Sequence, residues 1–294
     1  MGKMFKALEK AERDRHGVSD TKEKHGGDAS TSTHPETRGL INQDLVSLLA
    51  PASLAAEQFR KLRVNLANIH LSEPPQTILI TSAKEAEGKT IIAANLAITI
   101  AQEINARALL VETDLRSPTL SQWFGIPETK GLADYLSDGV ELASIIKRTS
   151  VDKLSLIPGG SIKENPVELI GSKKMKGLIQ ELKSHYPDRY IIFDSSPLLA
   201  TSEPNVMIKW VDAVLLIVKA GSTPREEIQQ SVGHLKRDKV IGVVLNDLEF
   251  KMSALHSKYF GSATYYHRHA FGEQHPGKVN GLRKFINRYG LQDI

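Results

Sequence analysis

The chain has 294 residues, a length that accommodates one large α/β domain with appended segments. Hydrophobic residues make up 40% of it and charged residues 24%, with a net charge of +4, as in ordinary globular proteins. The chain has no cysteine, which excludes disulfides, cysteine-ligated zinc and iron–sulfur clusters.

The first segments of the chain are predicted to lie outside the folded domain. Residues 1–15 have apolar side chains at helical spacing and predict a short N-terminal helix, whereas residues 16–43 are polar and rich in glycine, serine and threonine, as in a flexible linker. Residues 1–15 lack the apolar core of a secretory signal, and residues 91–111 contain too many polar side chains to cross a bilayer. We therefore expect a cytoplasmic protein that contacts a membrane only through a partner.

Residues 44–250 have the pattern of one α/β domain. Short apolar runs alternate with longer helical segments, which predicts a mainly parallel sheet covered by helices on both faces. The expected strands are residues 77–81, 108–111, 154–157, 190–193, 213–218 and 240–245. The expected helices are residues 54–69, 90–103, 173–184, 204–210 and 224–236.

A phosphate-binding loop follows the first expected strand. The sequence AKEAEGKT at residues 83–90 matches the P-loop pattern G-x-x-x-x-G-K-[ST], with Ala83 in place of the first glycine. In such a loop the backbone N–H groups face the phosphates, Lys89 adds a positive charge, and the Thr90 hydroxyl reaches Mg²⁺. We therefore predict a P-loop NTPase-like fold that binds ATP and Mg²⁺. The expected nucleotide-binding residues in this loop are Ala83, Glu87, Gly88, Lys89, Thr90 and Ile91.

Acidic residues end two further strands. Glu112 and Asp114 follow the second expected strand, together with Arg116, and Asp194 ends the fourth. The carboxyl ends of parallel strands lie at the same edge of a sheet as the P-loop. The three acids are therefore expected to converge on Mg²⁺ and on the γ-phosphate of the nucleotide.

These motifs together resemble the bacterial tyrosine kinases of capsule and exopolysaccharide synthesis. The resemblance includes the P-loop, a strand followed by the pattern [DE]-x-D-x-R, and a strand that ends in Asp-Ser-x-Pro. It covers roughly residues 45–250, and the opening MGKMFKALEKAE resembles the start of the stand-alone cytoplasmic members. The helix before the P-loop carries Glu57, Arg60 and Arg63, which resemble that family's self-association motif E-x-x-R-x-x-R.

The resemblance implies a role for each matching residue of the site. Lys89 would bind the β- and γ-phosphates, and Thr90, Asp114 and Asp194 would hold or orient Mg²⁺. Glu112 would stand where the family has an aspartate that is proposed to accept the proton of the substrate tyrosine. A phenol has a pKa of about 10, so a carboxylate or the field of the metal must assist its deprotonation.

Two further matches concern charge and base recognition, and a third concerns assembly. Arg116 would stabilise charge near the phosphates, and Asn246 matches a position that is often near the adenine. Glu57, Arg60 and Arg63 would pack one subunit against the next in a ring-like homo-oligomer.

The last segment, residues 251–294, is predicted to be a basic tail that carries the phosphate acceptors. It has seven lysines and arginines against two acidic residues. The resemblance implies autophosphorylation in trans at tyrosines of this tail, and Tyr259, Tyr265 and Tyr266 are the expected acceptors. It also implies an inner-membrane polysaccharide co-polymerase as the activator and a tyrosine phosphatase that reverses the modification.

The sequence departs from the family pattern at three positions of the expected site. Glu112 replaces an aspartate, which displaces the carboxylate by one methylene, and catalysis is sensitive to such shifts. Ser196 replaces a proline, and Ala86 replaces a glycine of the loop, so the loop there must accept a Cβ atom. We expect ATP binding to tolerate all three changes.

Two other functions are compatible with the same motifs. The first is a positioning ATPase that binds DNA or membrane through the basic tail, because Lys84 has the spacing of the signature lysine of that class; we interpret Lys84 instead as an exposed loop residue. The second is an ATP-binding pseudokinase that acts as a scaffold, which Glu112 suggests. We do not expect nucleic acid to be a partner of this chain. The tail histidines have no acid or cysteine at ligand spacing, so no metal cluster is expected.

Overall fold

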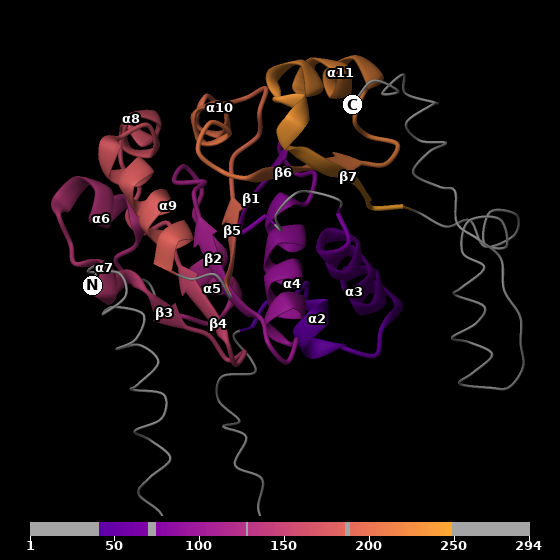
Figure 1. Ribbon diagram of the computed structural model, residues 1–294, viewed down its shortest axis with the longest axis horizontal. Helices are drawn as coiled ribbons and strands as arrows, with labels where there is room; N and C mark the ends of the chain where they lie inside the picture. Colours follow the sequence, from indigo (N-terminus) through magenta and orange to yellow (C-terminus); the bar gives the residue numbers. More distant parts are fainter. Residues whose placement is uncertain (1–40, 70–74, 128, 186–188, 249–294) are drawn as a thin grey trace, which may run out of the picture.

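The computed structural model describes residues 41–69, 75–127, 129–185 and 189–248 (Figure 1). The predicted N-terminal helix, most of the predicted linker, and the tail with its three expected acceptor tyrosines lie outside these residues. Within them, no helix is long and apolar enough to cross a membrane.

A seven-stranded sheet forms the centre of the domain, in the order β3-β4-β2-β5-β1-β6-β7. Every pairing in it is parallel except that of β3 with β4, which is antiparallel. This confirms the predicted mainly parallel sheet. The strands are β1 (Thr77–Ser82), β2 (Arg107–Glu112), β3 (Lys147–Arg148), β4 (Leu154–Ile157), β5 (Arg189–Asp194), β6 (Ala213–Lys219) and β7 (Val240–Asn246).

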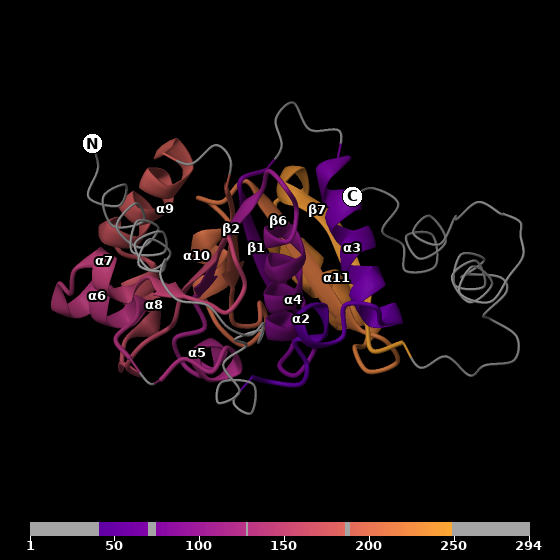
Figure 2. The same cartoon turned by 90° about the horizontal axis from the view of Figure 1, so that it is seen from below.

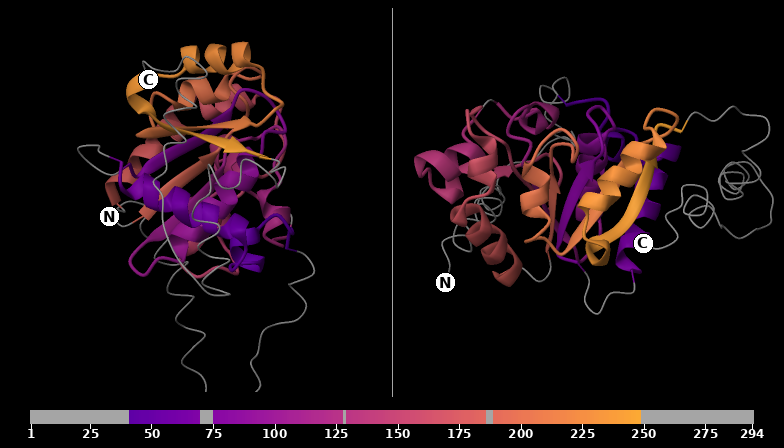
Figure 3. Two further views of the ribbon diagram at one scale, coloured as in Figure 1. Left: turned by 90° about the vertical axis from the view of Figure 1, so that its right-hand side faces the viewer. Right: turned by 90° about the horizontal axis from the view of Figure 1, so that it is seen from above.

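Helices cover both faces of the sheet, and β7 lies at its outer edge next to α11 (Figures 1, 2 and 3). The five helices that the sequence predicts are all present. The helices are α2 (Val46–Leu49), α3 (Leu54–Ala67), α4 (Lys89–Ala101), α5 (Leu120–Trp123), α6 (Leu132–Asp138), α7 (Leu142–Ile145), α8 (Pro166–Ile170), α9 (Lys173–His185), α10 (Glu203–Met207) and α11 (Arg225–His234), with a 3-10 turn η1 at Arg237–Lys239.

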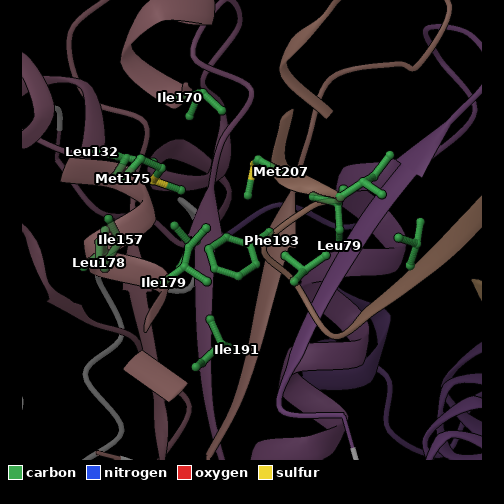
Figure 4. Packing of buried hydrophobic residues seen from close by; sticks show 14 of the residues in the cluster. Leu79, Leu132, Ile157, Ile170, Met175, Leu178, Ile179, Ile191, Phe193 and Met207 are labelled. Atoms are coloured by element: carbon green, nitrogen blue, oxygen red, sulfur yellow. The ribbon is translucent and has the colours of Figure 1, made fainter. Parts of the chain in front are cut away.

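Alternating side chains of the central strands divide the core into two layers. On β1, Leu79 contributes to the layer under α6 to α11, whereas Ile78 and Ile80 contribute to the layer under α2 to α5. Successive side chains of a strand point to opposite faces, so a strand that is covered on both sides is apolar throughout. Figure 4 shows Phe193 of β5 in the first layer, beside Ile179 of α9.

The N-terminal strap, which we define as residues 41–50, packs against the outside of α4. Ile41 forms an antiparallel bridge with Phe124, so the strap includes the last residues of the predicted linker. The backbone N–H of Ser47 donates to Oδ1 of Asn95 on α4 at 2.8 Å. With the sheet on its inner side and the strap and α3 on its outer side, α4 is buried along almost its whole length.

Asp212 joins the beginnings of β1 and β6. Its Oδ2 accepts hydrogen bonds from the backbone N–H of Thr77 at 3.0 Å and from the Thr77 hydroxyl at 2.8 Å, and its Oδ1 forms an ion pair with Lys183. Burial alone would raise the pKa of Asp212, but the hydrogen bonds from Lys183 and Thr77 outweigh burial and hold the pKa below its usual value.

We predict that Asp212→Asn lowers the free energy of unfolding by about 1–2 kcal/mol at pH 7. Because the folded-state pKa lies below that of the unfolded chain, the stabilisation by Asp212 is complete above the unfolded pKa and is lost as pH falls through the folded pKa. The difference between wild type and variant should therefore shrink below about pH 4. Urea unfolding at several pH values measures it, with Asp238→Asn in the exposed turn η1 as the control. Equal stability of wild type and Asp212→Asn at pH 7 would contradict this prediction.

Candidate active site

The P-loop connects β1 to α4, and two of its residues have left-handed backbone conformations. Gly88, which precedes α4, has φ of +92°. A Cβ atom at this position would lie only 2.1 Å from Nδ2 of Asn246, so both the backbone and the neighbouring side chain require glycine. Ala86 has φ of +57°, which an L-residue adopts at an energetic cost.

Ala86→Gly is therefore expected to raise the free energy of unfolding by about 0.5–1 kcal/mol, because glycine adopts this conformation without the clash of a Cβ. Urea unfolding measures the change. Gly139→Ala is the matched control: Gly139 has φ of +70° and open space around its Cα, so this substitution should be destabilising by a similar amount. Destabilisation by Ala86→Gly would show that the Ala86 methyl makes contacts that outweigh its backbone strain.

Side chains from the end of β7 and from the segment before α11 form hydrogen bonds with the P-loop. The buried carboxylate of Glu87 accepts a hydrogen bond from the backbone N–H of Lys84 at 2.9 Å and another from the hydroxyl of Thr223, which precedes α11. Nδ2 of Asn246 donates to the carbonyl oxygen of Glu87 at 2.9 Å. Asn246, expected from the sequence near the adenine, thus contacts the loop backbone directly, whereas the sequence offered no signal for Thr223.

The side chain of Lys84 takes no part in these hydrogen bonds and extends toward α11. It is 51% exposed, and its Nζ lies 3.1 Å from Oε1 of Glu227 on α11. The interpretation of Lys84 as an exposed loop residue is confirmed.

Asp194 lies at the carboxyl end of β5 and is buried. Burial raises its pKa to about 8, although a hydrogen bond from the Thr90 hydroxyl and the charge of Lys89 act in the opposite direction. Its Oδ1 has no hydrogen-bond partner among the described residues. A buried carboxylate oxygen without a partner, next to the P-loop threonine, is the donor that a hard cation such as Mg²⁺ requires.

Asp114 lies close enough to Lys89 for the charge of this lysine to act on its carboxylate. Burial raises its pKa, and the charge of Lys89, followed by hydrogen bonds from the backbone N–H groups of Arg116 and Ser117, acts against that rise. Lys89 itself is only 8% exposed. The structure therefore brings Lys89, Asp114 and Asp194 together at the carboxyl edge of the sheet, as expected from the ends of parallel strands.

The carboxylate of Glu112 connects two loops. Its Oε1 accepts hydrogen bonds from the backbone N–H groups of Thr119 at 2.5 Å and Leu120 at 2.8 Å, and its Oε2 accepts one from Gly159 at 2.7 Å. Glu112 is 1% exposed, and burial raises its pKa despite these three bonds. Glu112 thus joins the start of α5 to the loop after β4, a contact that the sequence did not predict.

Arg116 is paired with an acid that the sequence analysis did not single out. Its Nε and Nη2 each lie 2.9 Å from Oε1 of Glu203, the first residue of α10. Glu203 stands nine positions after Asp194 and belongs to no motif, so no local sequence signal marked it.

The residues expected to join subunits lie on α3. Nε of Arg60 lies 2.6 Å from Oε2 of Glu57, one turn earlier on the helix. Nη1 of Arg63 lies 3.5 Å from Oε2 of Glu103. On the same helix the apolar side chains of Leu54 and Val64 are 51% and 46% exposed.

Comparison with known proteins identifies the family. Residues 75–239 match the AAA domain family. The tyrosine-protein kinase YwqD of Bacillus subtilis is 30% identical over 221 residues, which cover 74% of this chain and 91% of YwqD. The chain belongs to the bacterial tyrosine-protein kinases.

Two solved structures share its fold. The kinase domain of the Escherichia coli tyrosine kinase ETK superposes with a TM-score of 0.66 at 28% identity and covers 71% of this chain and 82% of that domain. The chimerical protein CapA2B2 gives a TM-score of 0.66 at 29% identity and covers 71% and 92%. The P-loop fold of this bacterial tyrosine kinase implies that it binds a nucleotide.

Proposed function

We propose that this bacterial tyrosine kinase transfers the γ-phosphoryl group of Mg-ATP to tyrosines of its own C-terminal tail, in trans within a homo-oligomer. The observation that carries the proposal is the group of Lys89, Thr90, Asp114 and Asp194 at one edge of the sheet, with Oδ1 of Asp194 buried and free of a hydrogen-bond partner in the described part of the chain.

The chain's own residues bind and position the reacting groups. Lys89 and the backbone N–H groups before α4 would bind the phosphates, and Thr90, Asp114 and Asp194 would hold Mg²⁺. When bound, Mg²⁺ neutralises charge on the transferred phosphoryl group. Because phosphoryl transfer has a loose transition state, this positioning and charge neutralisation account for most of the rate.

Deprotonation of the acceptor phenol is assigned to Glu112, the last residue of β2. Burial raises the pKa of Glu112, which favours proton acceptance, but both of its oxygens already accept backbone hydrogen bonds. Asp114 accepts its backbone bonds from the neighbouring turn and is less buried than Glu112. We retain Glu112 as the predicted proton acceptor, with Asp114 beside it.

The tail with the expected acceptors Tyr259, Tyr265 and Tyr266 begins at residue 251, five positions after Asn246, which ends β7 and contacts the P-loop. Glu57, Arg60 and Arg63 would join neighbouring subunits so that the tail of one reaches the site of the next. On the family resemblance, the cytosolic segment of an inner-membrane polysaccharide co-polymerase would activate the kinase at the membrane, a tyrosine phosphatase would reset it, and polysaccharide polymerisation and export would be the regulated process.

Mass spectrometry of the full chain after incubation with Mg-ATP, with and without the cytosolic segment of the candidate activator, tests this function. The proposal predicts phosphotyrosine at position 259, 265 or 266, which Lys89→Ala abolishes. Lys84→Ala is the matched control, because it removes an exposed lysine from the same loop. ATP hydrolysis without phosphotyrosine would favour the positioning ATPase, and nucleotide binding with neither activity would favour the pseudokinase scaffold.

A further inference from the structure

Glu203 is a buried acid outside the motifs that define the family resemblance. It begins α10, after the loop that leaves β5 at Asp194, and it is 2% exposed. Its Oε1 accepts a hydrogen bond from Nε of Arg116 and forms an ion pair with Nη2 of the same side chain at 2.9 Å. Its Oε2 is buried and has no hydrogen-bond partner among the residues that the structure describes. Arg116 is therefore the counter-charge that this carboxylate depends on.

The pair is asymmetric, because one partner is inside the domain and the other faces outward. The side chain of Arg116 is 49% exposed, against 2% for Glu203. A guanidinium group has five N–H donors in one rigid plane, and Glu203 engages only the edge formed by Nε and Nη2. Nη1 makes no hydrogen bond within the described residues. Glu203 thus fixes the plane of the guanidinium and leaves the other edge available to a ligand.

The pair lies beside the acids of the site. The backbone N–H of Arg116 donates to the carboxylate of Asp114, and the charges of both Glu203 and Lys89 act on that carboxylate. An arginine with a free, oriented edge, whose backbone contacts the same carboxylate on which Lys89 acts, suits a phosphoryl group whose negative charge spreads over several oxygens during transfer. A lysine could not replace it, because an ammonium group offers a point charge without a fork.

We propose that Glu203 is a positioning residue for phosphoryl transfer, which holds Arg116 so that its free edge meets the phosphoryl group in transit. This inference rests on the proposed binding of Mg-ATP at the P-loop. Glu203 does not itself touch the nucleotide; it acts through the orientation of Arg116. Pre-orientation matters because a donor that must first be ordered in the transition state contributes less to catalysis.

The test compares two nucleotide states in the full chain: Mg-ADP, and Mg-ADP with fluoroaluminate, which imitates the phosphoryl group in transit. Glu203→Gln keeps the size of the side chain but removes the charge that orders Arg116. Removing one oriented donor from a transition state costs about 100- to 1,000-fold, so disordering it should weaken fluoroaluminate binding by about 10-fold or more, with ADP affinity changed by less than about 2-fold. Titration calorimetry measures both affinities.

Three comparisons make the test specific. Arg116→Lys should show the same selective loss, and adding Glu203→Gln to it should cause no further loss, because the two residues act as one unit. Asp138→Asn, which breaks the exposed pair with Lys163 on α6, should change neither affinity. Thermal unfolding of each variant establishes whether it is folded. If Glu203→Gln does not fold, Arg116→Lys is the primary variant of the test.

The outcomes separate this inference from the proposed function. An equal loss of both affinities, or no loss of either, would overturn the positioning role of Glu203. A wild type that binds neither Mg-ADP nor Mg-ADP with fluoroaluminate would also overturn it, because the inference needs a nucleotide at the P-loop. A selective loss of fluoroaluminate binding in a protein that forms no phosphotyrosine would support the role of Glu203 and refute autophosphorylation.

Discussion

Glu112→Ala is expected to lower the free energy of unfolding by about 2–4 kcal/mol, because it leaves three backbone N–H groups without the acceptor that joins two loops. Burial of the carboxylate opposes part of this stabilisation, as its raised pKa indicates. Glu112→Gln keeps an acceptor oxygen for one loop and should lose only about half as much. Urea unfolding measures both variants.

The same variants separate two roles of Glu112. If this residue only accepted a proton from tyrosine, alanine would reduce phosphorylation and leave stability unchanged, which would contradict the prediction above. Glu112→Asp is informative in the other direction. Its shorter side chain should not reach Gly159 and the start of α5 together, so it should be less stable than wild type even if it restores the carboxylate position of the family. A gain in stability would show that the three hydrogen bonds contribute nothing.

Asp194→Asn is expected to reduce tyrosine phosphorylation by at least about 100-fold, because a neutral amide cannot supply the anionic oxygen that a bound cation requires. Asparagine keeps the size of the side chain and an oxygen that accepts from Thr90, so the fold should be retained. Initial rates of tail phosphorylation at saturating Mg-ATP measure the effect.

The control for this prediction is Asp138→Asn, which removes a carboxylate of the same size from the exposed end of α6. It should leave the rate unchanged. A full rate in Asp194→Asn would remove Asp194 from the site and, with it, the role that we assign to its unpartnered oxygen. A weaker affinity for Mg-ATP than for ATP alone in the variant would locate the defect at the metal.

Most of the fold could be predicted because its main elements are long and strongly patterned. Strands that are covered on both faces are apolar throughout, as in Ile78, Leu79 and Ile80, and the long helices end within a few residues of their predicted limits. The elements that were missed are β3 and the short helices α2, α5, α6, α7 and α8. They are too short to repeat a period, and tertiary contacts define them.

The candidate site was predictable in part for a related reason. The P-loop and the acids at the ends of β2 and β5 have local spacing that reflects chemistry, so position along the chain was sufficient to find them. The backbone N–H donors to Glu112, the pairing of Glu203 with Arg116, and the contact of Thr223 with Glu87 join residues from different elements. Such pairings depend on strand order and side-chain direction, which one sequence does not display.

The N-terminal strap has a mechanical consequence. It is bonded to Asn95 of α4 and bridges to Phe124 at the end of α5, the short helix whose first N–H group is held by Glu112. A pulling force on the chain before Ile41 would therefore act on α4, which begins with Lys89, and on the segment that contains the acids Glu112 and Asp114. A tether at this end is coupled to the edge of the sheet that carries the candidate site, whereas a tether after β7 would act on the P-loop through Asn246.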